Sequence, residues 1–286
     1  MTTSRLVVVT ATTNYERAAH CIASWGVVPV VIVANAERDV PPNEVKPQLT
    51  SWLVYDDYLG TVEAFKRGVD YVLGQIPSAE VIACLHDDVI LSDPDWTTKV
   101  LRHFDTHPVT GLLGFGGAIG LGDDDLYQKP YAPVQLARKG FRSNMVDAEV
   151  HGIRSLLAER VACLDGFSQI GRREFWEGQY LDRTQQSYEP DTLELDILPR
   201  PWTVLSDLKI RHHFYDGALG CLAARAGWET WYLPIRCRHL GGQTAVGDEG
   251  YQAWAKRQHA QGDHGFWEQA HAISYQEFKD VLPLRV

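Results

Sequence analysis

Two adjacent carboxylates, Asp87 and Asp88, directly follow His86 and the apolar run 81–85. The run has the length and composition of a buried strand, and Ser92-Asp93-Pro94-Asp95 is typical of a helix start. Ligands of open α/β sheets bind just beyond the carboxyl ends of the strands. Because an unpaired buried charge is costly, the acid pair indicates a positive partner, most simply a divalent cation that holds a diphosphate. Alternatively, the acids cap the following helix.

Two later segments carry residues suited to the same chemistry. Asp216 precedes an apolar helical pattern, so it is either the N-cap of that helix or a general base that takes a proton from a hydroxyl. His239 follows a strand-like segment and precedes Gly241-Gly242, where the backbone can approach a ligand closely. A lone His is usually a surface or core residue. Because neutral imidazole is also a common metal ligand, we expect His239 to bind a metal or diphosphate together with Asp88.

Polar residues also stand where the first two strands are expected to end. If the sheet binds a nucleotide, Thr10, Thr12 and Asn35 would line its base and ribose; otherwise they are loop residues. The basic residues nearest to the irregular segments are suited to phosphate oxygens, although single Arg side chains are often only solvated. These residues are Lys139, Arg142, Arg172 and Arg173.

The elements that must position these residues follow an alternating pattern over about the first 115 residues. Repeated strand–helix units of this length predict an α/β fold with a mainly parallel central sheet and flanking helices. The expected strands are 6–10, 27–33, 52–55, 81–85 and 111–115, and the expected helices are 15–24, 60–73 and 96–104.

The rest of the chain is less regular. Residues 114–142 form a long Gly- and Asp-rich stretch, and loops of this length are more often functional than not. A second irregular region spans 179–202. Further along, the patterns predict a strand entering a turn at 160–167, a helix at 216–226, a strand at 228–233 and a helical tail at 251–278.

Composition narrows the class of protein. The chain has 286 residues, a net charge of −10 and no long block of Lys and Arg, which disfavours a nucleic acid as partner or acceptor. No apolar run reaches 18 residues, and the N-terminal residues do not resemble a signal peptide. Five widely spaced cysteines are typical of buried thiols in a reducing compartment. We therefore expect a cytoplasmic enzyme or binding protein without a membrane span.

In chain order, these segments resemble the nucleotide-sugar glycosyltransferases of the Rossmann-like GT-A fold, in particular glycosyltransferase family 2, over about residues 5–245. His86-Asp87-Asp88 is similar to the metal-binding DXD motif of the family, with His in place of the first Asp, a version like that of streptomycin-biosynthesis-type transferases. Asp57-Tyr58-Leu59-Gly60 is similar to a Gly-containing helix start of the family, and Asn35 stands where the family often has Asp. Leu164-Asp165-Gly166-Phe167 resembles its acceptor-side segment.

The resemblance implies roles for individual residues. Asp88 and the late His239 would bind the metal, Mn²⁺ or Mg²⁺, and Asp216, in a Tyr-Asp version of the catalytic motif, would be the base. Nucleotide-binding positions would be Thr10, Thr12, Asn35, Asp57, Gly60, Asp87 and Arg142, with a UDP-sugar the favoured donor. Residues 1–245 would form one catalytic domain, with a nucleotide-sugar half at about 1–115, an acceptor half at 116–245 and a helical extension at 246–286.

The implied reaction is metal-dependent transfer of a sugar from a nucleoside-diphosphate sugar to a saccharide or other hydroxyl acceptor, with inversion at the anomeric carbon. The segment 114–142 would close over the donor and exclude water. A retaining transferase and a non-catalytic module that binds nucleotide sugars or carbohydrates are the alternatives. Nucleotidyl transfer is disfavoured, because the early sequence lacks a Gly-rich, basic loop for a triphosphate.

Overall fold

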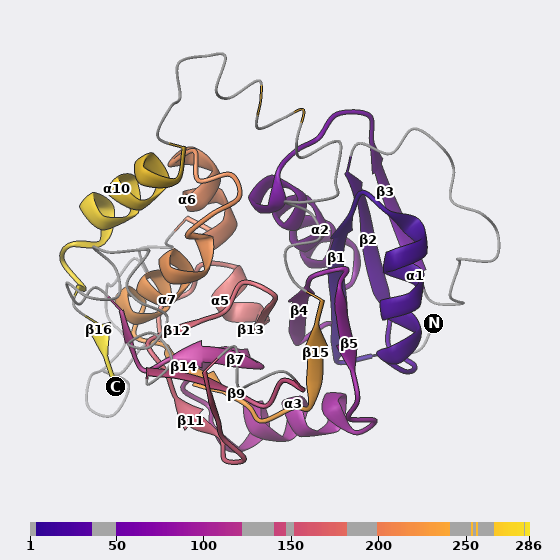
Figure 1. The fold of residues 1–286 in the computed structure, drawn as a ribbon, viewed down its shortest axis with the longest axis horizontal. Helices are drawn as coiled ribbons and strands as arrows, with labels where there is room; N and C mark the ends of the chain where they lie inside the picture. The colour runs from indigo at the N-terminus through magenta and orange to yellow at the C-terminus, as the bar shows by residue number, and fades with distance from the viewer. Residues whose placement is uncertain are drawn as a thin grey trace, which may run out of the picture.

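A central sheet of eight strands organises the computed structural model, which describes residues 4–35, 50–121, 140–146, 152–181, 199–240, 253, 256, 266–282 and 284–286 (Figure 1). Six strands run in one direction and two, β13 and β11, run against them. The predicted α/β fold with a mainly parallel sheet is therefore confirmed. In spatial order the strands are β11 (Glu159–Arg160), β14 (Glu229–Tyr232), β6 (Thr110–Gly114), β13 (Ser168–Arg172), β4 (Val81–Leu85), β1 (Leu6–Thr12), β2 (Val30–Asn35) and β3 (Thr50–Tyr55).

Helices cover both faces of this sheet, as expected when alternate strand residues point to opposite sides. In β1, Leu6 and Val8 pack into a core with α1 (Tyr15–Ser24) and α3 (Trp96–Thr106). Val7 and Val9 face the opposite core. That second core includes α2 (Thr61–Gln75), α5 (Arg173–Trp176), α6 (Pro201–Asp207) and α7 (Tyr215–Arg225). No helix in the described part of the chain is long and apolar enough to cross a membrane.

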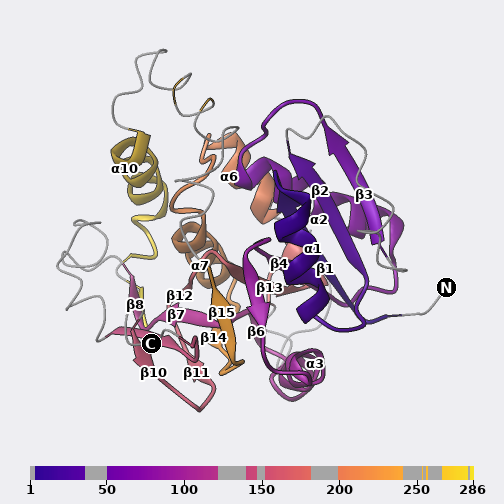
Figure 2. The same ribbon diagram turned by 45° about the vertical axis from the view of Figure 1, so that its right-hand side comes forward.

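The structure has three smaller sheets besides the central one. β5 (Val89–Leu91) pairs antiparallel with β15 (Cys237–His239), so a late segment returns to the end of β4. The four-stranded sheet consists of β10 (Ile153–Arg154), β9 (Phe141–Ser143), β7 (Gly116–Ala118) and β12 (Cys163–Leu164), and the last sheet pairs β16 (Leu284–Arg285) with β8 (Gly120–Leu121). Figure 2 shows β7, β8 and β10 of these sheets together to the left of β1 and β2.

The C-terminal tail contains the helix α10 (Phe266–Phe278), which matches the last part of the helical tail expected at 251–278; most of 251–265 lies outside the described residues. Phe278 is fully buried, and Arg225 of α7 forms ion pairs with Glu277 and Asp280. The tail therefore packs against α7 in the described residues. The division into a domain at 1–245 and an extension at 246–286 stays a prediction.

Several expected elements differ from those observed. The segment 160–167, expected as one strand entering a turn, contains the end of β11 and the separate strand β12. The strand expected at 27–33 begins only at Val30, since Val27 is 97% exposed. The central strand β13 was not predicted, because its sequence Ser-Gln-Ile-Gly-Arg lacks an apolar run. Most of the expected closing segment 114–142 and of the irregular region 179–202 lies outside the described residues. All five cysteines are buried thiols, as expected.

Two glycines in α2 give a test of how closely this helix packs on β1. A methyl group added at Gly68 would lie 2.2 Å from Cγ1 of Val9, whereas one added at the exposed Gly74 would meet nothing within 4 Å. We expect Gly68→Ala to lower the free energy of unfolding by about 2 kcal/mol, because overpacking outweighs the better helix propensity of Ala. Gly74→Ala should raise it by about 0.5 to 1 kcal/mol. Urea denaturation measures both, and equal signs would contradict the packing seen here.

Candidate functional site

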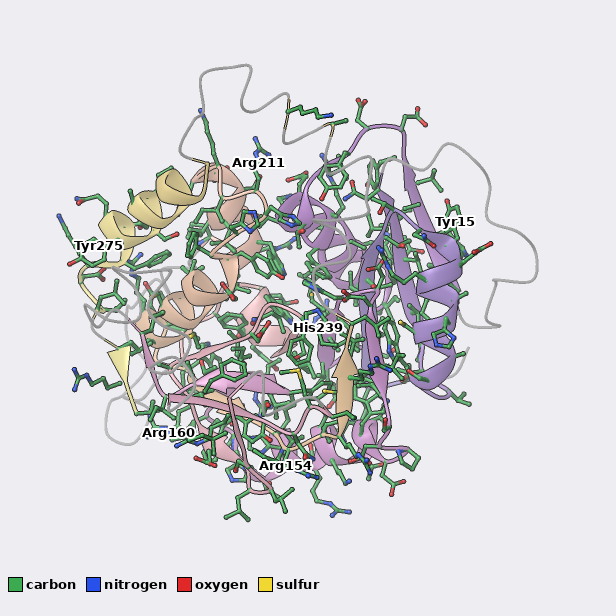
Figure 3. The ribbon with its side chains drawn as sticks, viewed as in Figure 1. Tyr15, Arg154, Arg160, Arg211, His239 and Tyr275 are labelled. Carbon is green, nitrogen blue, oxygen red and sulfur yellow. The ribbon has the colours of Figure 1, made fainter. Side chains whose placement is uncertain are left out.

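Three potential metal ligands meet at the carboxyl end of β4: His86, Asp88 and His239. One side-chain atom from each lies within 4.8 Å of the others. Oδ1 of Asp88 is 3.2 Å from Nε2 of His239 and 3.9 Å from Nδ1 of His86. Figure 3 places His239 near the centre of the molecule, where β15 lies beside β5. The structure therefore brings the two predicted metal ligands together and adds His86 to them.

The local chemistry of these residues suits a divalent metal. Asp88 is buried, and its Oδ1 has no hydrogen-bond partner among the described residues, although it lies close to His239. Burial favours a higher pKa for Asp88, but His239, His86 and Arg17 outweigh it and lower the pKa to about 2. Burial also lowers the pKa of His86 to about 4. At neutral pH the site thus offers an ionised carboxylate and a neutral imidazole, the forms in which these groups bind metals.

Strand pairing explains how His239 reaches this position. His239 is opposite Val89 in the β5–β15 pair, and the backbone N–H of Leu240 donates to the carbonyl oxygen of Asp88 over 3.0 Å. The imidazole of His239 stacks on Phe167, with 4.8 Å between ring centroids. Both contacts are made by residues remote in sequence, and together they hold the ring against the turn that carries Asp88.

The other acid of the pair, Asp87, has a different set of partners. Its Oδ2 accepts a hydrogen bond from Oγ1 of Thr12 at 2.6 Å and forms an ion pair with Arg17 at 2.7 Å. Burial raises the pKa of Asp87 to about 6, and Arg17 and Thr12 limit that rise. The helix α3 has Asp95 at its N-cap, so capping of α3 by Asp87 or Asp88, the alternative left open by the sequence, is wrong.

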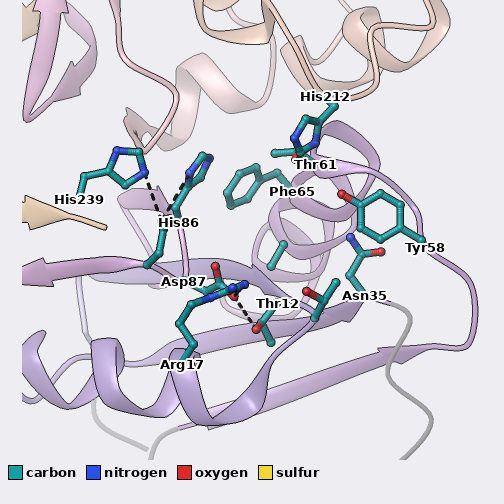
Figure 4. A pocket seen from close by; sticks show the side chains of 13 residues that line it. Thr12, Arg17, Asn35, Tyr58, Thr61, Phe65, His86, Asp87, His212 and His239 are labelled. Atoms are coloured by element: carbon teal, nitrogen blue, oxygen red, sulfur yellow. Dashed lines mark hydrogen bonds and ion pairs between the residues drawn. The ribbon is translucent and has the colours of Figure 1, made fainter. Parts of the chain in front are cut away.

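A pocket extends from the three metal-ligand candidates across the ends of β1 and β2 (Figure 4). In this view His239 lies at one end, and Asn35 and Tyr58 lie at the other. Oδ1 of Asn35 accepts a hydrogen bond from the backbone N–H of Leu59 at 2.6 Å, and Oγ1 of Thr61 is 2.6 Å from Nδ1 of His212. The remaining lining residues are Ala11, Thr12, Thr13, Arg17, Phe65, His86, Asp87 and Asp88.

Asp216 lies in the first turn of α7, and the residue before it touches the metal-ligand group. The N-cap of α7 is Phe214, in a left-handed conformation with φ 62°, so Asp216 is not the N-cap. Its Oδ1 accepts a hydrogen bond from the backbone N–H of Gly217 at 2.9 Å. Burial, followed by the nearby carboxylate of Asp165, raises the pKa of Asp216 to about 6. Such a carboxyl group is suited to accept a proton near neutral pH.

Asp216 itself is not among the residues that line the pocket, and five further predicted residues are likewise not brought to it or lie outside what is described. Thr10 is fully buried in β1, Asp57 is exposed, and Gly60 serves as the N-cap of α2. Arg142 belongs to β9 and forms an ion pair with Glu159 at 3.0 Å, and Lys139 lies outside the described residues. Their suggested contacts with a nucleotide stay predictions without geometric support.

Arg172 and Arg173 are likewise not phosphate-facing groups in the structure. The guanidinium of Arg172 donates to the backbone carbonyl oxygens of Phe104, His107 and Thr110. That of Arg173 donates to carbonyl oxygens at the end of α2 and to Glu177. Both side chains therefore satisfy acceptors at the ends of helices.

The pocket also contains residues that sequence reasoning missed. His86 was visible within the His-Asp-Asp motif, and its spacing of two from Asp88 was a signal for a second ligand. Arg17 gave no signal, because an Arg in the first turns of an amphipathic helix is ordinarily solvated. Tyr58 and His212 come from separate loops that only the fold brings to one pocket.

Comparison with known proteins finds no match by sequence and limited similarity to solved structures. No protein-family model matches the sequence, and no curated protein matches it significantly. One similar solved structure is mannosyltransferase PcManGT from Pyrobaculum calidifontis in complex with GDP-Man and Mn²⁺, with 16% identity and a TM-score of 0.47 over 95% of this chain and 69% of that chain. Another is GalNAc-T7 with UDP, GalNAc and Mn²⁺, with 12% identity and a TM-score of 0.47 over 97% of this chain and 57% of that chain.

Proposed function

We propose that this protein is a metal-dependent glycosyltransferase that moves a sugar from a nucleoside-diphosphate sugar to a hydroxyl acceptor. The observation that carries the proposal is the convergence of His86, Asp88 and His239 at one end of a pocket formed at strand ends. A diphosphate held at that end would extend its nucleoside toward Asn35 and Tyr58 at the other. The order of motifs in the sequence supports the same substrate class.

The types of metal-ligand side chain also indicate which cation the site would bind. Two imidazoles and one carboxylate form a nitrogen-rich site, whereas Mg²⁺ prefers oxygen ligands and keeps several waters. The two imidazoles therefore disfavour Mg²⁺, and of the two cations expected from the sequence we propose Mn²⁺. When bound, it would neutralise negative charge on the departing diphosphate. Arg17, which already pairs with Asp87, adds a positive charge to the same wall of the pocket.

Asp216 is proposed as the general base. It would accept the proton of the acceptor hydroxyl while the hydroxyl oxygen attacks the anomeric carbon. The bond from that carbon to the diphosphate oxygen breaks as the new bond forms, and the diphosphate leaves with the electron pair. The raised pKa of Asp216 supports this role, as does its place next to Tyr215, which contacts His86. Attack opposite the leaving group inverts the configuration.

A donor panel tests the proposal. The protein is incubated with UDP-, GDP-, dTDP- and CDP-sugars, with Mn²⁺ or with EDTA, and released nucleotide and thermal shift are followed. We expect a rise in Tm and slow donor hydrolysis with one nucleotide class, UDP-sugars first, and loss of both with EDTA. Stabilisation without turnover in the presence of diverse saccharide acceptors would favour a binding module. No stabilisation by any nucleotide with Mn²⁺ would contradict the proposal.

A further inference from the structure

We propose that Tyr215 is a positioning residue for the metal centre, because its hydroxyl fixes the imidazole of His86 in the tautomer that presents Nδ1 to a metal. The inference concerns a residue outside the predicted metal ligands, and it rests on the metal site of the proposed function. It follows from two hydrogen bonds made by one phenol oxygen and from a glycine that makes room for that oxygen.

The two hydrogen bonds determine where the proton of His86 resides. The hydroxyl of Tyr215 donates to the backbone oxygen of Gly166 over 2.9 Å. The same oxygen lies 2.7 Å from Nε2 of His86. A phenol has a single hydrogen, which Gly166 already receives, so the contact with His86 requires an N–H on Nε2. Nδ1 then keeps its lone pair.

The atom left unprotonated is the one that faces the other ligands. Nδ1 of His86 lies 3.9 Å from Oδ1 of Asp88, on the side where the metal candidates converge. A metal-binding His typically donates its other N–H to a fixed acceptor, which sets the orientation of the ring and strengthens the ligand. The Tyr215 oxygen occupies the place of that acceptor.

Gly166 is required for this arrangement. A Cβ atom built on Gly166 would lie 2.5 Å from the hydroxyl oxygen of Tyr215 and 2.9 Å from its Cζ atom. Any side chain there would displace the phenol. Tyr215 is only 4% exposed, so water has little access to replace its hydrogen bonds. Since Tyr215 begins α7 and precedes Asp216, the contact also ties the metal ligands to the helix that bears the proposed base.

Tyr215→Phe tests the inference because it removes only the hydroxyl. We expect the dissociation constant for Mn²⁺, measured by isothermal titration without nucleotide, to rise about 10- to 100-fold. Tyr232→Phe is the matched control: Tyr232 is also buried, and its hydroxyl donates to the backbone oxygen of Ser155 over 2.8 Å. This control should leave Mn²⁺ affinity unchanged. Equal affinity in wild type and Tyr215→Phe would overturn the inference.

The tautomer itself can be read from the ¹⁵N chemical shifts of the His86 ring in the metal-free protein. We expect Nε2 to carry the proton in wild type, and a mixture of tautomers in Tyr215→Phe. Gly166→Ala, which displaces the phenol by a different route, should shift the tautomer in the same direction. A wild-type ring protonated at Nδ1 would refute the inference. If the wild type binds no metal, the proposed function fails, and the ¹⁵N shifts still decide the role of Tyr215 for His86.

Discussion

Asp216→Asn is expected to lower sugar transfer by about 10²- to 10⁴-fold while making the folded protein more stable at pH 7. Burial and the carboxylate of Asp165 raise the pKa of Asp216 from 3.8 to about 6. The folded state therefore binds this proton more tightly than the unfolded state, so stability falls as the pH rises through this interval. At pH 7 the buried carboxyl group must ionise, which lowers the free energy of unfolding. An amide does not ionise and removes this loss, which we put at about 1 to 2 kcal/mol after allowing for partial solvent access.

The pH dependence separates this effect from a change in packing. The stability gain of Asp216→Asn should be absent below about pH 4, where both side chains are neutral, and should grow to its full value above about pH 6. Chemical denaturation at several pH values measures it. Asp207→Asn, at an exposed carboxylate that ends α6, should stay within about 0.5 kcal/mol of wild type throughout. A variant less stable than wild type at pH 7 would instead assign Asp216 to stabilising the helix.

Asp88→Asn is expected to weaken Mn²⁺ binding by at least about 100-fold and to abolish transfer, because an amide replaces the anionic ligand of the site. In wild type, Mn²⁺ at 100 times its dissociation constant should stabilise the fold by about 2.7 kcal/mol, and the variant should lose this gain. Thermal unfolding with Mn²⁺ and with EDTA measures both. Asp105→Asn, which removes a surface partner of Arg5, is the control. Persistence of the Mn²⁺ effect in Asp88→Asn would place the cation elsewhere.

The sequence alone was sufficient to predict the order of the early strands and helices and the position of the acidic residues Asp87 and Asp88. Asp87 and Asp88 directly follow His86 and the apolar run of β4. Because a buried strand of this kind ends at the edge of the sheet where ligands bind, the sequence predicted that both carboxylates would lie there. The partnership of Asp88 and His239 was predicted from ligand chemistry. The pairing of β5 with β15 that produces it was not, since three-residue strands carry too little pattern to be recognised.

The predicted residues that the structure does not bring to the pocket are explained by their positions in the fold. At the end of β1, Thr10 and Thr12 look equivalent in the sequence. Only Thr12 reaches the pocket, because Thr10 lies deeper in the strand and is completely covered. Arg142 was expected at the nucleotide, but it belongs to a separate small sheet, where Glu159 already holds it. Distances between segments that are far apart in sequence decide these outcomes, and local composition does not encode them.

The pairing of His239 with Val89, about 150 residues earlier in the chain, sets the moment at which the centre can form during protein synthesis. At about 5 to 20 residues per second, a ribosome needs roughly 8 to 30 s to make the intervening chain. During that time β1 to β4 can already pair, but the nascent chain offers two ligands instead of three. The three proposed ligands can therefore come together only after β15 has been synthesised and has paired with β5, which would make cation binding at this site a late event of folding.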